Sequence, residues 1–227
     1  MNIIIFGATG VAGSGVLEAC LRHPGIDKIT VITRRSTGII HEKLTEVIHR
    51  DFSDFSTVEP FLQNLDACLY CLGVSQTQVP GEEEYNKVTY GYTMAAAKAL
   101  NRINRHIIFC YLSAAGADPS MKSRLMWMRI KGKTENELNK LHFGKLFIFR
   151  PGVIHAQVGA RPRLWAFRVF DFLYPVINLL VPSLVTTNRE IGCSMINAIL
   201  GLSIKNILTN RDIRILSGID SGLGVLS

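Results

Sequence analysis

A glycine-rich turn stands immediately after the first apolar run of the chain. The run Asn2–Phe6 has the length and isoleucine content of a buried strand, and Gly13–His23 reads as a helix ended by Pro24-Gly25. The turn between them consists of Gly7, Ala8, Thr9, Gly10, Val11, Ala12 and Gly13. A helix N-terminus offers free backbone N–H groups and the positive end of a dipole, which suit a pyrophosphate. The order strand, glycine turn, helix therefore predicts a dinucleotide-binding unit.

Short apolar runs alternate with helical patterns over the first two thirds of the chain. The apolar runs are Asn2–Phe6, Lys28–Thr33, Thr45–His49, Ala67–Leu72, His106–Ser113 and Lys145–Arg150. The helical patterns are Gly13–His23, Ser56–Gln63, Glu83–Asn101 and Pro119–Leu141. This alternation predicts an α/β fold with a doubly wound, mostly parallel sheet of the Rossmann type and helices on both faces.

The last third of the chain is less regular. We expect one domain over residues 1–227, in which residues 155–210 form a variable segment covering the substrate site. Leu164–Leu173 and Glu190–Leu200 read as helices, and Arg214–Leu216 as a short edge strand. The apolar tract Phe172–Leu184 is interrupted by prolines, so we interpret it as buried or interfacial rather than transmembrane.

The net charge of +7 is dispersed, with no run of more than two basic residues. A nucleic-acid groove would need clustered Lys and Arg with interleaved aromatic residues, so a phosphate-bearing cofactor explains part of the excess better than nucleic acid does. The five cysteines favour reduced thiols, and with no signal peptide in the sequence we expect a cytoplasmic protein. Cys68 and Cys71 form a CxxC pair inside an apolar run, which we interpret as two core residues rather than a redox or metal site. No metal site is expected.

The end of the second apolar run distinguishes between the two nicotinamide dinucleotides. Sites that prefer NAD(H) place Asp or Glu there to accept from the ribose 2′-hydroxyl. This chain has Arg34 and Arg35 instead. A guanidinium binds a 2′-phosphate, often bidentately, so the sequence favours NADP(H) over NAD(H). Of the two arginines, we expect Arg34 rather than Arg35 to bind the 2′-phosphate. The alternative is that both arginines are solvated surface charges.

Taken in order, the motifs resemble the atypical short-chain dehydrogenases/reductases, most of all their Tat-interacting-protein-like (NmrA-like) branch. The resemblance covers roughly residues 1–200. Beyond the glycine turn it rests on Thr33-Arg34-Arg35, Asp51-Phe52, Cys71-Leu72-Gly73, Ser113-Ala114-Ala115-Gly116-Ala117-Asp118, Lys131-Gly132, Phe149-Arg150-Pro151-Gly152-Val153 and Arg161-Pro162.

The resemblance implies a role for several residues beside the cofactor. Asp51 and Phe52 would border the adenine, and Val88 would pack near the adenosine. Leu72 and Gly73 would line the path of the ribose and diphosphate. The nicotinamide amide would lie against Pro151, Gly152 and Val153. Each could instead be an ordinary residue of a strand end.

The resemblance also implies a catalytic group of Ser, Tyr and Lys, from which this chain departs. Ser113 and Lys131 match the family pattern, and Lys131 would also hold the nicotinamide ribose. Trp127 stands four residues before Lys131, where the family has the proton-donating tyrosine. An indole N–H is no usable acid at neutral pH. Nearby tyrosines could substitute, namely Tyr85, Tyr90 or Tyr92.

Three functions follow from these residues. The first is an NADPH-dependent oxidoreductase acting on a small carbonyl or sugar-type substrate. The second is a non-catalytic NADP(H)-binding regulator with a protein partner, which Trp127 favours. The third is a peripheral protein that contacts a membrane surface weakly through the apolar stretch Trp165–Val185. Either a monomer or a homodimer is compatible with the sequence.

Overall fold

The computed structural model describes residues 1–159 and 185–219. Seven strands form one parallel sheet in the order β3-β2-β1-β4-β5-β6-β9. Their bounds are β1 Asn2–Phe6, β2 Lys28–Thr33, β3 Leu44–Ile48, β4 Ala67–Tyr70, β5 Ile108–Leu112, β6 Lys145–Arg150 and β9 Ile207–Thr209. The winding direction reverses between β1 and β4, which lie side by side. The predicted doubly wound Rossmann fold is confirmed.

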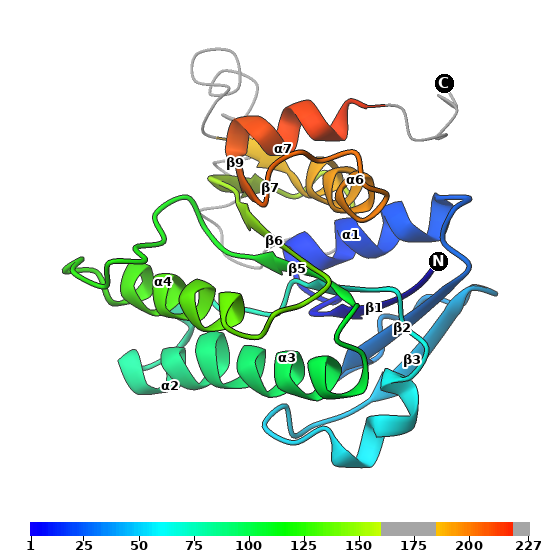
Figure 1. Ribbon diagram of the computed structural model, residues 1–227, viewed down its shortest axis with the longest axis horizontal. Helices are drawn as coiled ribbons and strands as arrows, with labels where there is room; N and C mark the ends of the chain where they lie inside the picture. Colours follow the sequence, from blue (N-terminus) through cyan, green and yellow to red (C-terminus); the bar gives the residue numbers. More distant parts are fainter. Residues whose placement is uncertain (160–184, 220–227) are drawn as a thin grey trace.

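Helices cover both faces of this sheet, as Figure 1 shows. One face carries α1 (Val11–Arg22), α6 (Asn188–Ile199) and α7 (Asn210–Ser217). The opposite face carries α2 (Glu82–Asn86), α3 (Tyr92–Ile103) and α4 (Met126–Asn139). Two short 3₁₀ helices are η1 (Ser56–Leu62) and η2 (Gln76–Gln78), and η3 (Lys87–Gly91) is a π-helical turn.

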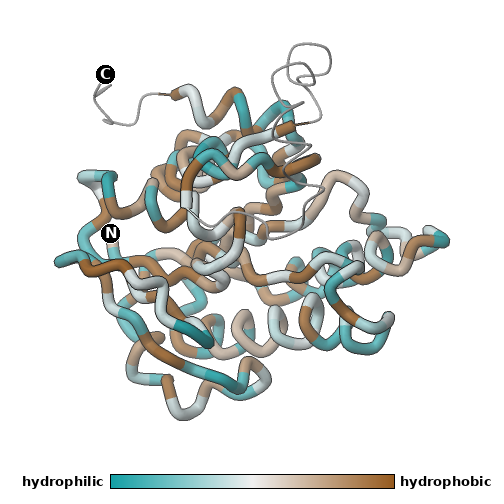
Figure 2. The backbone as a smooth tube through the Cα atoms, turned by 180° about the vertical axis from the view of Figure 1, so that it is seen from behind, coloured by the Kyte–Doolittle hydropathy of each residue, from teal (hydrophilic) through white to brown (hydrophobic). Residues whose placement is uncertain are grey.

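Side chains of the central strands alternate between two apolar layers. In β1, Ile3 and Ile5 face α1 and α6, whereas Ile4 and Phe6 belong to the layer under α3. All four side chains are fully buried, as expected for a parallel sheet covered on both faces. Figure 2 shows the hydrophobic strands inside and more hydrophilic turns at the rim.

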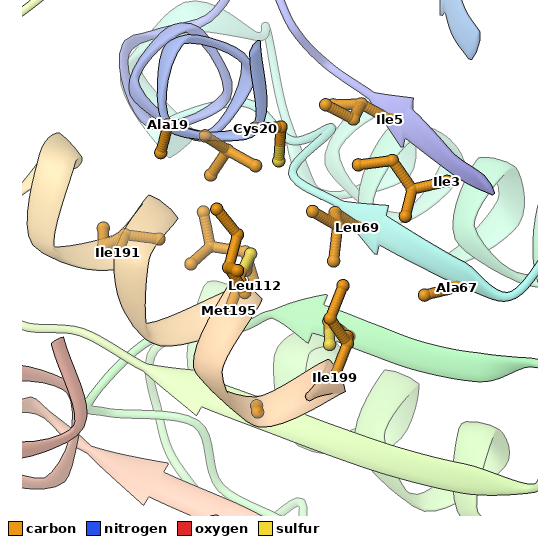
Figure 3. Close-up of a cluster of buried hydrophobic side chains, with 14 of the residues drawn as sticks. Ile3, Ile5, Ala19, Cys20, Ala67, Leu69, Leu112, Ile191, Met195 and Ile199 are labelled. Atoms are coloured by element: carbon orange, nitrogen blue, oxygen red, sulfur yellow. The ribbon is translucent and has the colours of Figure 1, made fainter. Parts of the chain in front are cut away.

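Helices α1 and α6 pack closely because glycines lie where they cross. A Cβ atom on Gly15 would come within 2.5 Å of the Asn188 carbonyl oxygen, and one on Gly192 within 2.8 Å of the Ala19 Cβ. Figure 3 shows the result: Ala19 and Cys20 of α1 and Met195 of α6 meet over the β1 and β4 side chains. Residue 192 falls within the segment predicted to cover the site. Within the described part of that segment, α6 packs against α1 and the sheet, and residues 160–184 lie outside the described residues.

The predicted strand Arg214–Leu216 is wrong, because these residues lie in α7. The edge strand is β9, which ends at Thr209. Thr209 caps α7: its hydroxyl accepts from the Asp212 N–H, and the Asp212 carboxylate accepts from the Thr209 N–H at 3.0 Å. This reciprocal cap starts the helix. The apolar run that follows is too short for its pattern to show whether it forms a helix or a strand.

Two helices of the opposite face differ from the sequence prediction. The helix predicted over Pro119–Leu141 begins only at Met126. The carboxylate of Asp118 accepts backbone N–H groups from Ser120, Lys122 and Ser123, which holds the preceding segment as a loop. The helix predicted over Glu83–Asn101 is interrupted by η3, which contains Val88. Such π turns re-aim the residues within a helix and recur at functional sites.

A second, two-stranded parallel sheet lies beyond β6. It pairs β7 (Val153–His155) with β8 (Val185–Thr187) and was not predicted. The predicted helix Leu164–Leu173 and the apolar tract Phe172–Leu184 lie outside the described residues. Within the described ranges, no helix combines the length and apolar character needed to cross a bilayer.

Candidate functional site

The predicted site residues lie where strands of the parallel sheet end. The turn 7–13 follows β1, Arg34 follows β2, Asp51 comes soon after β3, and Ser113 directly follows β5. Because the strands are parallel, these ends share one edge of the sheet. That edge, at a change of winding direction, is where ligands bind in doubly wound folds.

The glycine turn has a conformation that other residues would not adopt. Gly7 has a φ of +82°, and a Cβ there would lie 2.6 Å from the backbone nitrogen of Leu72. A Cβ on Gly13 would come within 2.1 Å of the Gly7 carbonyl oxygen, so only glycine lets α1 start this close to β1. A Cβ on Gly10 would meet only the Gly7 carbonyl oxygen, at 3.3 Å.

The start of α1 suits an anion. Thr9 and Gly10 are exposed, no acidic residue lies in the first turn of α1, and no side chain caps the helix. The first N–H groups of an α-helix have no partner within the helix. The turn therefore fits a diphosphate in the manner expected of a dinucleotide site.

Arg34 and Arg35 are exposed at the end of β2. The Thr33 hydroxyl donates to the Arg35 carbonyl oxygen at 2.7 Å, which fixes the backbone there. In the described part of the chain, neither guanidinium forms a hydrogen bond or a salt bridge. Both are thus available to an anionic ligand. The nearby Glu46 carboxylate accepts from the Ser36 hydroxyl at 2.7 Å and from the Thr37 N–H at 2.6 Å, which holds the loop after the arginines.

The residues predicted to border the adenosine differ in exposure. Asp51 is exposed, and hydrogen bonds from Ser53 lower the pKa of its carboxyl. The Phe52 side chain is instead buried in the core, where its ring packs edge-on against Phe6 at 6.4 Å. Only the backbone of Phe52 can therefore border a ligand. Val88 is half-buried in the π turn η3.

Lys131 lies at the carboxyl ends of the central strands. Its Nζ donates to the carbonyl oxygen of Leu112, the last residue of β5, at 3.1 Å. The ammonium also interacts electrostatically with the thiol of Cys71, which follows β4. Burial lowers the pKa of Lys131 to about 8, and the carboxylate of Glu135 acts in the opposite direction.

Ser113 belongs to a buried polar group that the sequence analysis missed. Its hydroxyl donates to the carboxylate of Glu135, and both side chains are almost fully buried. Arg150, the last residue of β6, donates to both oxygens of the same carboxylate, from Nε at 3.0 Å and from Nη2. Hydrogen bonding to Glu135 raises the pKa of Arg150. The sequence did contain a signal for Glu135. It stands four residues after Lys131, and this spacing places both side chains on one face of α4.

Trp127 occupies the first turn of α4 and is half-buried. Its ring reaches the loop that follows β5, since a Cβ on Gly116 would lie 2.5 Å from the Trp127 Cη2 atom. The alternative tyrosines have other neighbours. The Lys133 ammonium lies 3.9 Å from the centre of the Tyr90 ring, Tyr92 packs against Phe52, and Tyr85 is buried.

The last predicted group, Pro151 to Val153, joins β6 to β7. Pro151 is buried and its carbonyl oxygen accepts from the Ala115 N–H at 2.8 Å, which ties this turn to the loop after Ser113. The Gly152 N–H donates to the Asn210 side chain at 2.8 Å, and Val153 is exposed. The turn is thus held beside the Ser113 loop at the same edge.

The cysteine pair is part of the core. Cys68 lies within β4 and is fully buried, Cys71 follows that strand, and both thiols are free. Burial raises the pKa of Cys71 to about 12. Among residues 1–159 and 185–219, no group of three or more His, Cys, Asp or Glu side chains could hold a metal ion.

Comparison with known proteins relates this geometry to a family. Residues 3–124 match the family described as the NAD dependent epimerase/dehydratase family. Protein HTATIP2 of Rattus norvegicus is 30% identical over 172 residues, which are 74% of this chain and 69% of that protein. The resemblance to the Tat-interacting-protein-like branch is thereby confirmed.

A second relative and one solved structure extend the comparison. Protein FMP52, mitochondrial, of Candida albicans is 30% identical over 157 residues, or 68% of this chain and 67% of that protein. The chain thus spans about two thirds of the length of these two relatives. The structure of UDP-glucuronic acid 4-epimerase from Bacillus cereus in complex with NAD has a TM-score of 0.65 at 14% identity, covering 92% of this chain and 76% of that chain.

The prediction of a cytoplasmic location is wrong, because the FMP52 relatives are named mitochondrial. The prediction rested on five cysteines interpreted as reduced thiols and on the expectation of no signal peptide. Reduced thiols exclude an oxidising compartment, but they do not distinguish between reducing ones.

Proposed function

Because the chain belongs to the NAD dependent epimerase/dehydratase family, we propose that it is a nicotinamide-dinucleotide oxidoreductase acting on a small carbonyl or sugar-type substrate. The observation that carries this proposal is the position of Lys131. Its ammonium lies at the ends of β4 and β5, at the same sheet edge as the open glycine turn after β1. A dinucleotide laid along this edge would have its diphosphate at the turn and its nicotinamide end near Lys131.

The cofactor would be held by the chain's own groups in a fixed order along the edge. The first turn of α1 would bind the diphosphate through backbone N–H groups. Leu72 and Gly73 would line the adjoining path, and Asp51 with the Phe52 backbone would border the adenine. Lys131 would hold the nicotinamide ribose. When bound, the dinucleotide supplies hydride transfer to or from the substrate carbon.

We assign NADP(H) rather than NAD(H) as the cofactor because of Arg34 and Arg35. Both are exposed beyond β2 without a described side-chain partner. A carboxylate that would accept from a ribose 2′-hydroxyl and repel a 2′-phosphate does not follow β2 directly. The guanidinium of Arg34 would pair with the 2′-phosphate.

A second candidate function is a non-catalytic NADP(H)-binding regulator that binds a protein partner. Trp127 favours it, because the proton-donating tyrosine of related enzymes is absent from this position. In that case the fold would bind the cofactor and signal its presence without turnover. Lys131→Ala distinguishes the two functions: abolished NADPH oxidation with a panel of aldehydes and quinones supports the enzyme. Cofactor-dependent capture of a partner without turnover supports the regulator.

Calorimetric titration with NADPH and NADH tests the cofactor assignment. We expect Arg34→Ala to weaken NADPH binding at least tenfold, on the order of one charge-assisted contact, and to leave NADH binding nearly unchanged. Arg105→Ala is the matched control, because Arg105 is an exposed arginine that precedes β5 at the opposite edge of the sheet. Equal losses for both cofactors in Arg34→Ala would remove the assignment, and absence of any dinucleotide binding would remove the proposed function.

A further inference from the structure

The side chain of Asn188 joins three segments of the chain beside the start of α1. Asn188 is the first residue of α6 and is fully buried. Its Nδ2 donates to the Val11 carbonyl oxygen at 2.9 Å and to the Val158 carbonyl oxygen at 2.6 Å. Its Oδ1 accepts from the Gln157 N–H at 3.0 Å and from the Val158 N–H at 3.3 Å. The carboxamide thus uses both of its hydrogens and both lone pairs of its oxygen.

Gly15 leaves the space that this carboxamide occupies. It stands four residues after Val11, on the same face of α1. A Cβ atom on Gly15 would lie 2.7 Å from the Asn188 Cγ. Further along, the two helices meet through apolar side chains such as Ala19 and Met195 (Figure 3). Packing of α1 against α6 alone therefore does not require an amide at the first position of α6.

The Val11 carbonyl also accepts from the Ser14 hydroxyl, at 3.1 Å. Both side-chain donors come in addition to the bond that an α-helix supplies to such a carbonyl. Ser14 belongs to α1 itself, whereas Asn188 approaches the same oxygen from α6. Two side chains from different helices therefore draw electron density toward one oxygen in the first turn of α1.

The Val11 carbonyl and the Ala12 N–H belong to one peptide group, whose atoms share electrons by resonance. A donor on the oxygen withdraws electron density from the nitrogen, which makes the N–H a stronger donor in its turn. The Ala12 N–H is among the groups that the first turn of a helix leaves without a helical partner. It thus belongs to the set of N–H groups that would bind the diphosphate.

We infer that Asn188 and Ser14 are positioning residues of the diphosphate site. They act through the peptide group of Val11 and Ala12, and they strengthen the hydrogen bond that the Ala12 N–H donates to the diphosphate. This inference rests on the proposed function. Asn188 follows Val11 by 177 positions in the sequence, so the start of α6 contributes to a site whose other residues come from the beginning of the chain.

Nuclear magnetic resonance of the unliganded protein tests the polarisation of this peptide group. The sequence contains one Val-Ala pair, Val11-Ala12, so carbonyl-labelled valine combined with nitrogen-labelled alanine gives a single amide signal. We expect this signal to move upfield in Asn188→Leu and in Ser14→Ala, because each variant removes a donor from the Val11 oxygen. Ser14→Ala decides the test if Asn188→Leu does not fold. A signal that does not move would overturn the inference.

Binding measurements test the effect on the diphosphate. NADPH is compared with adenosine 2′-monophosphate, which carries the adenine and the 2′-phosphate but no diphosphate. We expect Asn188→Leu to weaken NADPH binding about threefold, the effect of about three tenths of a charge-assisted hydrogen bond, and to leave binding of the monophosphate unchanged. A purely structural role would lower both affinities together or neither, and either result would overturn the inference.

Asn197→Leu is the matched control. Asn197 is a buried asparagine of the same helix, and its Nδ2 donates to the carbonyl oxygens of Leu216 at 2.7 Å and Ile219 at 2.9 Å. The variant therefore loses two comparable hydrogen bonds that do not involve α1. We expect it to leave both the Ala12 signal and the ratio of the two affinities unchanged. A ratio that falls as far in Asn197→Leu as in Asn188→Leu would overturn the inference.

Inorganic pyrophosphate separates this inference from the proposed function. If the wild-type protein binds no dinucleotide, yet pyrophosphate moves the Ala12 signal and binds more weakly to Asn188→Leu, the proposed function alone fails. A wild-type Ala12 signal that responds to neither dinucleotide nor pyrophosphate would overturn the inference as well.

Discussion

Gly116 lies directly against the ring of Trp127, which stands where the resemblance to short-chain dehydrogenases/reductases implies a tyrosine. A Cβ atom on Gly116 would lie 2.5 Å from Cη2 of the indole and 2.8 Å from the Met128 Cε. The loop after β5 and the first turn of α4 therefore fit together through a glycine and a large aromatic ring. This contact fixes where the indole stands relative to Ser113, three residues earlier in the same loop.

Gly116→Ala should therefore displace the indole and destabilise the protein by about 1–3 kcal/mol, the usual cost of overpacking. The indole emission should shift as the ring moves. Gly81→Ala is the matched control, since a Cβ there meets nothing within 4 Å. Adding Trp127→Leu to Gly116→Ala should recover part of the lost stability, because it removes the atoms that clash. If Gly116→Ala and Gly81→Ala melt at the same temperature, the contact is not as described.

The first half of the fold could be predicted from the sequence because local patterns and tertiary packing agree there. In β1 the apolar run, the glycine turn and the following helix each point to the same structure. The end of the chain was harder to predict. The run Arg214–Leu216 is too short to show a period, and the helix is decided by the capping pair of Thr209 and Asp212 that precedes it.

Part of the candidate site could likewise be predicted from local sequence patterns, and part could not. Gly7, Ser113 and Lys131 could be located because each belongs to a short motif next to a strand or on a helix. The pairing of Glu135 with Arg150 could not, because it joins α4 to the end of β6 and is created by the tertiary fold alone. The burial of the Phe52 ring was also not foreseen, since the motif gives its backbone position but not the direction of its side chain.

The lowered pKa of Lys131 has a consequence for stability. Its folded-state pKa is about 8, below the ordinary 10.5. Below pH 8 the folded state must bury a charged ammonium. From about pH 8 to 10.5 the unfolded chain binds more protons, so this residue's contribution to stability rises with pH.

Lys131→Met removes that penalty together with the bond to the Leu112 carbonyl. We expect the variant to be more stable than wild type at pH 7 by about 1–2 kcal/mol, a difference that shrinks as the pH approaches 10. Thermal melts of both proteins from pH 7 to 10 measure it, and the difference between them cancels the titration of other groups. Lys98→Met, at an exposed position of α3, should show no such trend. A constant difference across this range would contradict the lowered pKa.

The buried thiols should be unreactive in the native protein. Cys20, Cys68 and Cys110 are fully buried, and burial raises the pKa of each above its ordinary value. Because the thiolate is the reactive form, an alkylating reagent at pH 8 should label these three far more slowly than the half-buried Cys193. In denaturant all five cysteines should react. Mass spectrometry of the labelled peptides assigns each rate, and rapid native labelling of Cys68 would contradict its place in the core.

Trp127→Tyr should place a proton donor where this chain has an indole. A phenol placed four residues before Lys131 stands on the same face of α4, where the ammonium favours its ionised form. Reduction of a carbonyl requires such a donor, because Ser113 gives its hydrogen to Glu135. We expect the rate of NADPH oxidation with aldehydes and ketones to rise by about 10²-fold, the lower end of general acid catalysis.

Trp127→Phe separates this chemistry from the change in packing. It removes the same contact with Gly116 as the tyrosine variant does, but it carries no hydroxyl. Its rate should stay at the wild-type value while that of Trp127→Tyr rises. Equal rates for the phenylalanine and tyrosine variants would mean that residue 127 does not reach the reacting oxygen. Trp127 would then contribute to packing only.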